Sequence, residues 1–526
     1  MSLIRAVFAL VVANVFAAVA SAQTSACIGS SDVACTEQGS IRGEVQGATM
    51  AFKGIPYAAP PVGPLRWRPP APVASWDGVR DGSRFGAICP QIVGEEVKGD
   101  EDCLYINVWR PREKPDQPLP VMVWLHGGGN HTRSGEGSAD FGGVGYNGEQ
   151  LVPQGVVFVS VNARLGVLGF LSHAALSAER PEKISGNYGS LDQIAVLQWI
   201  KRNISAFGGD ASRVFLFGTS AGGGNTCALI TSPLTRGLVH GVVMQSSVPA
   251  GCEIKTLAED ENETGQRVAK AAGCDTAVDT AACLRGKSTT EIVKAVPGTF
   301  SLFPRVYGPN MDGHVFPEQP IKIIAAQRHP AMPMIIGNTA RETWGWSNAV
   351  TDETSYAAAL DKAFGAAARD RILKLYPVDA YSSARAAFTQ VTTDAEFTCT
   401  SRRVARTLSK AQSEPVFRYI FDHTLENDPQ LKPLGAIHTL EHAFLFAWQG
   451  KYRPTDTDLI VQRRLVGYWT RLAITGNPNG AGDPDWPAET GNDVFLEIGP
   501  NTVSKTGAAA ANCEFWDQVP MLWPHL

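Results

Sequence analysis

The sequence has no surplus of basic residues and few charged residues of either sign. Its net charge is −5, its pI is near 6.1, and charged residues make up 18% of the chain. A chain without a basic patch lacks the electrostatic footprint of a nucleic-acid-binding protein, so we expect no nucleic-acid partner. Hydrophobic residues are not scarce, because they make up 44% of the chain. This composition indicates a globular protein with a large core rather than a disordered or fibrous one.

Long apolar runs are absent after the first 22 residues, so we expect no stable membrane anchor. Residues 1–22 begin with one basic residue, Arg5, continue as an apolar run from Ala6 to Ala20, and end in Ala20-Ser21-Ala22. The run is shorter than the roughly 20 residues that span a bilayer, and its ending is typical of a cleavage site. We predict a secretory signal peptide at 1–22, a single domain at 23–526, and a secreted or periplasmic protein. An uncleaved anchor is the alternative.

No cysteine pair has metal-site spacing with histidines, so we expect no metal ion and no other cofactor. The ten cysteines are an even number. In the oxidising compartment that a signal peptide implies, they are expected to pair as disulfides. The residues alone leave the pairing open. The cysteines are Cys27, Cys35, Cys89, Cys103, Cys227, Cys252, Cys274, Cys283, Cys399 and Cys513.

Three apolar runs, at 121–125, 156–161 and 213–217, have the composition of buried strands. Between the second and the third, a helix is predicted from 186 onward, because Ile194, Leu197 and Ile200 recur on one helical face. Strands that alternate with helices predict a parallel sheet flanked by helices.

The third run ends in Gly218-Thr219-Ser220-Ala221-Gly222. A strand, a Gly-x-Ser-x-Gly turn and small residues that can open a helix present a serine at the tip of a sharp turn. Ser220 is therefore our candidate nucleophile. The alternative is an ordinary serine in a glycine-rich loop, because such short motifs recur by chance.

The first run leads directly into His126-Gly127-Gly128-Gly129. Consecutive glycines let main-chain N–H groups converge on one point, as an oxyanion requires. We predict an oxyanion hole from the N–H groups of Gly128, Gly129 and Ala221, with a flexible hairpin tip as the alternative. The long polar loop that follows, 130–148, is of a length that is usually functional or disordered.

Together these segments resemble the type-B carboxylesterase family, the α/β-hydrolases that include cholinesterases and lipases. The resemblance covers nearly all of the mature chain. It implies an α/β-hydrolase fold: a mostly parallel sheet of eight or more strands, with insertions that form a lid and a gorge above the serine. The motifs are Lys53-Gly54-Ile55-Pro56-Tyr57, Pro64-Leu65-Arg66-Trp67, Glu101-Asp102-Cys103-Leu104-Tyr105-Ile106-Asn107, His126-Gly127-Gly128-Gly129, Gly186-Asn187-Tyr188-Gly189, Leu191-Asp192-Gln193, Phe207-Gly208-Gly209-Asp210, the serine motif and Met244-Gln245-Ser246.

The family's triad is serine, glutamate and histidine in that order. The segment 334–342 is an apolar strand leading to Glu342 and resembles the family's acid loop, although Arg341-Glu342-Thr343 stands where Asp-Glu-Gly is usual. Asp312 is the rival acid, which we interpret as a structural turn.

The base is implied by Gly435-Ala436-Ile437-His438-Thr439-Leu440-Glu441, which resembles the family's Gly-Ala-x-His-x-x-Glu. The motif favours His438 over its neighbours His423 and His442. It places Glu441 outside the triad itself, as a residue of the surrounding shell.

The resemblance also implies three disulfides, Cys89 with Cys103, Cys274 with Cys283, and Cys399 with Cys513, the last within the family-like ending Cys513-Glu514-Phe515-Trp516. The remaining pairs would be Cys27 with Cys35 and Cys227 with Cys252, and these stay open.

Departures from the family's pattern bear on the substrate. Thr219 replaces the usual glutamate before the serine, and polar Asn130 follows the glycines where an apolar residue is common. The loop between Cys89 and Cys103 has no aromatic residue, whereas cholinesterases hold quaternary ammonium with such a ring. We therefore do not expect choline esters as substrates.

Four further residues are candidates for the substrate pocket or its rim. Trp344 and Trp346, just past the acid, would line the gorge, with core packing as the alternative. Arg133 and Arg341 would meet a carboxylate on the substrate, with an ordinary solvated role as the alternative.

The sequence thus predicts a secreted serine carboxylesterase with a Ser-His-Glu triad that acts on a small-molecule ester. Two alternatives remain: a non-catalytic cholinesterase-like adhesion protein, and a lipase that acts at interfaces. The oligomeric state and the acyl and alcohol preferences do not follow from the sequence.

Overall fold

The computed structural model describes residues 31–247, 252–299, 306–448 and 452–518. The predicted signal peptide at 1–22 and Cys27 lie outside these ranges. Within them, no helix combines the length and the apolar character needed to cross a bilayer.

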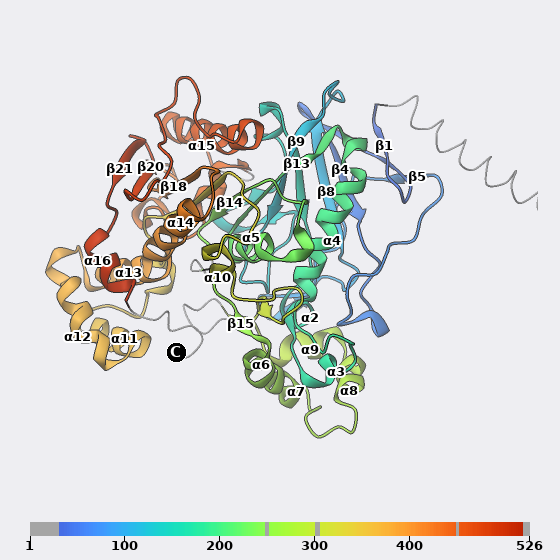
Figure 1. Cartoon of the computed structure of the whole chain (residues 1–526), viewed down its shortest axis with the longest axis horizontal. Coiled ribbons are helices and arrows are strands. Elements are labelled where there is room, and N and C mark those ends of the chain that lie inside the picture. Colours follow the sequence, from blue (N-terminus) through green and yellow to red (C-terminus); the bar gives the residue numbers. More distant parts are fainter. Residues whose placement is uncertain (1–30, 248–251, 300–305, 449–451, 519–526) are drawn as a thin grey trace, which may run out of the picture.

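An 11-stranded sheet forms the centre of the described chain (Figure 1), in the order β21-β20-β18-β17-β14-β13-β9-β12-β8-β4-β3. Neighbouring strands from β12 to β20 pair in parallel, and the strands at both edges pair antiparallel. The prediction of a large, mostly parallel sheet is confirmed. The strands are β3 (Glu44–Gln46), β4 (Thr49–Pro56), β8 (Tyr105–Pro111), β9 (Leu119–Leu125), β12 (Val157–Val161), β13 (Gly209–Thr219), β14 (Gly241–Gln245), β17 (Met334–Thr339), β18 (Val416–Phe421), β20 (Val494–Ile498) and β21 (Val503–Thr506).

Alternating side chains of the central strands pack into two separate cores, because successive residues of a strand point to opposite faces of the sheet. On β9, Val121 and Val123 belong to one core, whereas Met122 and Trp124 belong to the other. The first core is covered by α4 (Tyr188–Asn203), α5 (Ala221–Thr231), α10 (Pro320–Ala325) and α14 (Cys399–Ala411), and the second by α15 (Asp456–Thr475). Both faces of the sheet are therefore buried, which explains why its strands read as continuous apolar runs.

Two helical groups outside these layers have small cores of their own. One contains α6 (Leu257–Asp260), α7 (Gln266–Ala271), α8 (Thr280–Gly286) and α9 (Thr289–Ala295), with α2 (Gly166–Phe170) and α3 (Ala174–Ala178) nearby. The other contains α11 (Glu353–Phe364), α12 (Ala366–Leu375), α13 (Ala384–Thr393) and α16 (Ala510–Trp516). They lie at the bottom and the lower left of Figure 1. That these groups are the insertions implied by the resemblance, and that they form a lid, stays a prediction.

Short strands form the smaller sheets of the described chain. One small sheet contains β1 (Val33–Cys35), β2 (Ser40–Arg42) and β5 (Val79–Asp81); a second contains β10 (Gly137–Ser138), β11 (Val144–Gly145) and β19 (Ala447–Trp448). The two-stranded pairs are β6 (Gln91–Val93) with β7 (Glu96–Lys98) and β15 (Lys255–Thr256) with β16 (Asn310–Met311).

Disulfides link Cys89 to Cys103, Cys227 to Cys252, Cys274 to Cys283, and Cys399 to Cys513. Three of these are the pairs that the family resemblance implied, and the Cys227–Cys252 bridge settles a pair that the sequence left open. The pairing of Cys35 with Cys27 stays a prediction.

The bridge between Cys399 and Cys513 is expected to contribute most to stability, because it closes the longest loop. Its sequence separation is 114, against 9 for Cys274–Cys283. Loop-closure entropy predicts roughly 5 kcal/mol for the long loop and about 2–3 kcal/mol for the short one. Replacing both Cys399 and Cys513 with serine should therefore lower the melting temperature more than the same double replacement at Cys274 and Cys283. An equal or larger loss in the second variant would contradict this ranking.

Candidate active site

Ser220 occupies a sharp turn between strand and helix. β13 ends at Thr219, α5 begins at Ala221, and Ser220 between them has φ 55° and ψ −124°. A positive φ is strained for a residue with a side chain and persists only where its surroundings enforce it. The Ser220 N–H donates to the Gln245 carbonyl at 2.9 Å, which helps to hold the turn.

The glycines on either side of Ser220 allow α5 to pack directly on the end of β9. A Cβ on Gly222 would lie 2.1 Å from the Leu125 carbonyl oxygen, and one on Gly218 would lie 2.7 Å from the same atom. Real Cβ atoms do not approach backbone this closely, so both positions require glycine. The motif thus brings the nucleophile turn beside the strand that leads into the glycine run.

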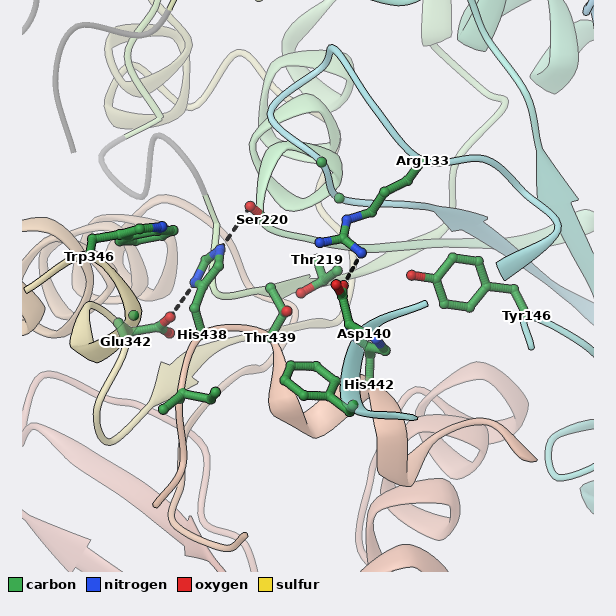
Figure 2. Close-up of a pocket in the computed structure, with 15 residues that line it drawn as sticks. Arg133, Asp140, Tyr146, Thr219, Ser220, Glu342, Trp346, His438, Thr439 and His442 are labelled. Atoms are coloured by element: carbon green, nitrogen blue, oxygen red, sulfur yellow. Dashed lines mark hydrogen bonds and ion pairs between the residues drawn. The ribbon is translucent and has the colours of Figure 1, made fainter. Parts of the chain in front are cut away.

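His438 connects Ser220 to Glu342 (Figure 2). Its Nε2 lies 2.9 Å from Ser220 Oγ, and its Nδ1 is hydrogen-bonded to Glu342 Oε2. The rings of Trp346 and Phe397 pack on the imidazole, with centroids 4.9 Å and 5.4 Å away. The structure therefore brings together the three side chains that the sequence singled out, in one hydrogen-bonded line.

Glu342 is fixed by its own strand and by the histidine's loop. Its carboxylate is buried, and Oε1 accepts the Thr339 N–H at 2.7 Å. The preceding residue, Arg341, forms a parallel bridge with Ile437, and its N–H donates to the Ala436 carbonyl at 2.9 Å. These backbone contacts join the loop after β17 to the loop after β18. The Arg341–Ile437 bridge therefore positions both Glu342 and His438.

The rival residues have structural partners elsewhere. Asp312 Oδ1 accepts N–H groups from the next turn, including Val315 at 2.7 Å, and Oδ2 accepts from Asn187 at 2.8 Å. His423 Nε2 is hydrogen-bonded to buried Asp458 at 2.8 Å. Both are thus engaged away from Ser220. His442 lies in the wall of the pocket described below rather than in the hydrogen-bonded line.

The glycine run lies across from the nucleophile in left-handed conformations. Gly128 has φ 100° and Gly129 has φ 61°, and a Cβ on Gly128 would lie 2.2 Å from the Thr132 carbonyl oxygen. Among the residues that the structure describes, neither glycine N–H donates a hydrogen bond. The Ala221 N–H belongs to the first turn of α5, where helix geometry offers no carbonyl. All three N–H groups are thus available to an acceptor beside Ser220.

A pocket of about 360 Å³ opens over Ser220. Trp346 and Arg133 line it, whereas Trp344, Asn130 and Arg341 do not. Its wall is formed by Gly127, Gly128, Arg133, Asp140, Phe141, Tyr146, Thr219, Ser220, Glu342, Gly345, Trp346, Ile437, His438, Thr439 and His442.

The expectations for Trp344 and Asn130 require correction. The guanidinium of Arg385 lies over the Trp344 ring, 4.2 Å from the ring centroid, and Trp344 is not part of the pocket wall. The Asn130 side chain exchanges hydrogen bonds with Asn225, whose Nδ2 donates to it at 2.8 Å. The Arg341 guanidinium also lies over the Trp344 ring, 5.8 Å from the ring centroid, rather than in the pocket.

Residues 30–516 match the model of the Carboxylesterase family. The chain belongs to this family. The fold is accordingly the α/β-hydrolase fold, and the chain is a type-B carboxylesterase, an enzyme class that hydrolyses carboxylic esters.

Curated relatives match over most of their length. The chain is 33% identical to mouse acylcarnitine hydrolase, with 91% of this chain and 90% of that protein aligned. It is 32% identical to fumonisin B1 esterase of Sphingopyxis macrogoltabida, with 90% and 87% aligned. It is also 32% identical to human cocaine esterase, with 92% and 91% aligned.

A second buried carboxyl group, Glu441, lies close to Glu342 in this carboxylesterase. Its Oε1 accepts hydrogen bonds from Ser246 Oγ at 2.9 Å and from the Tyr419 hydroxyl at 3.2 Å. Burial, and then the negative charge of Glu342, raise the pKa of Glu441 to about 8. Glu441 is therefore largely protonated at neutral pH, which limits the negative charge beside Glu342.

Sequence reasoning missed several residues of the pocket wall. Tyr146 and His442 were not assigned to it, and Phe397 was not expected against His438. The only available signal was the length and polarity of the loop 130–148, which contributes Arg133, Asp140, Phe141 and Tyr146. Phe397 and His442 lie outside the family motifs.

Replacing Gly222 with alanine should damage the nucleophile turn, because the new methyl group would overlap the Leu125 carbonyl. We expect at least a tenfold loss of ester hydrolysis and a lower melting temperature, since overpacking commonly costs about 1–3 kcal/mol. Gly286→Ala is the matched control, because nothing lies within 4 Å of the added Cβ. Full activity of Gly222→Ala would contradict the proposed close packing.

Glu441→Gln tests the raised pKa of the buried carboxyl group. The folded protein holds the proton more tightly than the unfolded chain, whose reference pKa is 4.5, so wild-type stability should fall as pH rises from about 5 to about 8. Glutamine cannot ionise, so the melting temperature of wild type relative to the variant should decline across this range. A difference that does not change with pH would refute the assignment.

Proposed function

We propose that the chain is an exported serine carboxylesterase in which Ser220 is the nucleophile, His438 the general base and Glu342 the orienting acid. Ester hydrolysis is the chemistry of its family; the assignment of these residues and the export are our proposals. The observation that carries the assignment is the continuous hydrogen-bonded line from Ser220 through His438 to Glu342 in the wall of one pocket.

In the first half of the reaction, Ser220 Oγ attacks the ester carbonyl carbon while His438 Nε2 takes its proton. Glu342 remains ionised, keeps the proton of His438 on Nδ1 and stabilises the imidazolium that forms. The negative charge on the carbonyl oxygen is received by the N–H groups of Gly128, Gly129 and Ala221. Loss of one such donor typically costs about 3 kcal/mol, roughly two powers of ten in rate.

The tetrahedral intermediate then collapses. The bond to the alcohol breaks, His438 gives its proton to the departing oxygen, and the acyl group remains on Ser220. Water attacks the acyl-enzyme by the same route, with His438 as its base, and the carboxylic acid leaves with Ser220 restored. No cofactor takes part in these steps.

The substrate is proposed to be a small-molecule ester. The relatives are named for three different substrates, acylcarnitine, fumonisin B1 and cocaine. Similarity to these relatives therefore does not identify one substrate for this chain. The absence of an aromatic residue between Cys89 and Cys103 still disfavours choline esters.

Export is supported by the leader-like residues 1–22 and by the four disulfides described, which persist in oxidising compartments. The protein is therefore proposed to act outside the cytoplasm, whether in a periplasm or beyond the cell.

Ser220→Ala should lower kcat for a nitrophenyl ester by at least about a thousandfold, because the covalent route is lost. An organophosphate should block wild type and modify Ser220, which mass spectrometry of the digested protein can detect. Ser382→Ala is a suitable control, because that serine is exposed and does not line the pocket. Wild type that neither hydrolyses esters nor reacts would favour the adhesion protein. A rate that jumps only when the substrate forms droplets would favour the lipase.

A further inference from the structure

The pocket has two chemically different sides. In Figure 2, Trp346 stands beyond His438 on one side, and Arg133, Asp140, Tyr146 and His442 gather on the other. Thr219, the residue before the nucleophile, also lines the pocket. We call the group Arg133, Asp140, Tyr146, Thr219 and His442 the polar recess. It adjoins the reacting serine, so whatever it binds is close to the scissile ester.

The two charged members of the recess neutralise each other. Arg133 Nη1 forms an ion pair with Asp140, and Ser138 hydrogen-bonds to both. The loop that carries them is held by β10 and β11, and β11 pairs with β19. The pair is thus a fixed dipole with no net charge. A ligand carboxylate attracted by Arg133 would be repelled by Asp140. A ligand cation would be attracted by Asp140 and repelled by Arg133.

The three uncharged members have buried polar atoms without a hydrogen-bond partner among the described residues. These atoms are the Tyr146 hydroxyl, Thr219 Oγ1 and both ring nitrogens of His442, and each residue is at most 1% exposed. Burial, and then the positive charge of Arg133, lower the pKa of His442 to about 3, so its ring is neutral and has one donor and one acceptor nitrogen. Buried polar groups are costly unless they are satisfied, so this wall is suited to a polar ligand group.

The recess therefore offers donors and acceptors together. Thr219 has a hydroxyl that can do both, His442 has one nitrogen of each kind, Arg133 donates and Asp140 accepts. A carboxylate only accepts and an ammonium only donates, whereas a hydroxyl group does both and carries no charge. We propose that the polar recess binds a hydroxyl group of the substrate, and that this carboxylesterase prefers hydroxylated esters over plain, anionic or cationic ones. This inference rests on the proposed function.

Two sets of esters of matched size test the preference and tell which part of the ester carries the hydroxyl. The acyl set is nitrophenyl butyrate, nitrophenyl hydroxybutyrate and the nitrophenyl monoester of succinic acid. The alcohol set is propyl butyrate, the butyrate monoester of glycerol, and butyrylcholine. In one of the two sets, we expect kcat/KM for the hydroxylated ester to exceed that of each other member by about tenfold, the discrimination of one or two hydrogen bonds.

Thr219→Val and His442→Leu should reduce this preference, because each removes hydrogen-bonding groups from the recess while keeping a side chain of similar bulk. The ratio of kcat/KM between the hydroxylated and the plain ester should fall several-fold in each variant. Thr393→Val is the matched control, since its hydroxyl is equally buried and unpartnered but lies in α13, away from the pocket. Its ratio should equal that of wild type.

The outcomes separate this inference from the proposed function. Retained hydrolysis in Ser220→Ala would remove the proposed catalytic assignment. Active wild type that favours the plain, anionic or cationic ester in both sets would overturn the hydroxyl-binding recess alone. So would a preference for the hydroxylated ester that survives unchanged in both Thr219→Val and His442→Leu.

Discussion

The parallel pairing of β9, β13, β17 and β18 is the constraint on which the site depends. Parallel strands end at the same edge of a sheet, so the loops that follow them meet there. The glycine run follows β9, Ser220 follows β13, Glu342 follows β17, and His438 lies in the connection after β18. Ser220 and His438 are 218 residues apart in the chain and still share a hydrogen bond.

The sheet alone does not bring His438 within reach of Ser220. β13 and β18 are separated by β14 and β17, and strands lie about 4.8 Å apart, so the two loops start roughly 14 Å from each other. The loop after β18 must therefore return toward β13. The bridge between Arg341 and Ile437 fixes that return, because it pairs the acid's loop with the base's loop before either side chain reaches the serine.

The charges around the triad are kept low by several independent means. Glu441 binds a proton at neutral pH, Thr219 stands where the family usually has a carboxylate, and Arg133 is paired with Asp140. Glu342 is the carboxyl group in hydrogen-bond contact with His438. Because Arg133 is paired with Asp140 and Thr219 is uncharged, the polarity of the pocket wall comes mainly from neutral groups.

The sequence could predict the sheet and the turn at Ser220 because both leave local patterns. Buried strands read as apolar runs, and Gly218 and Gly222 mark a turn that no other residue allows. Glu342 and His438 leave no such pattern, and they were predicted from the family motif.

The pocket wall was harder to predict, because it depends on details below the scale of a motif. Trp344 and Trp346 both lie in one 3₁₀ turn, where residues two apart point in directions about 120° from each other, and only Trp346 lines the pocket. Asn130 has φ 59°, and its side chain is bonded to Asn225. Neither orientation is encoded in the residue type alone.

Phe397, which packs on His438, lies close in sequence to a disulfide whose second cysteine is synthesised late. Phe397 lies two residues before Cys399, whose disulfide partner is Cys513. Ribosomal synthesis delivers Cys513 long after the nucleophile, the acid and the base, so this bridge can form only in the late polypeptide. The disulfide next to Phe397, whose ring packs on His438, therefore forms late in maturation. Nascent chains that end before Cys513 cannot form it.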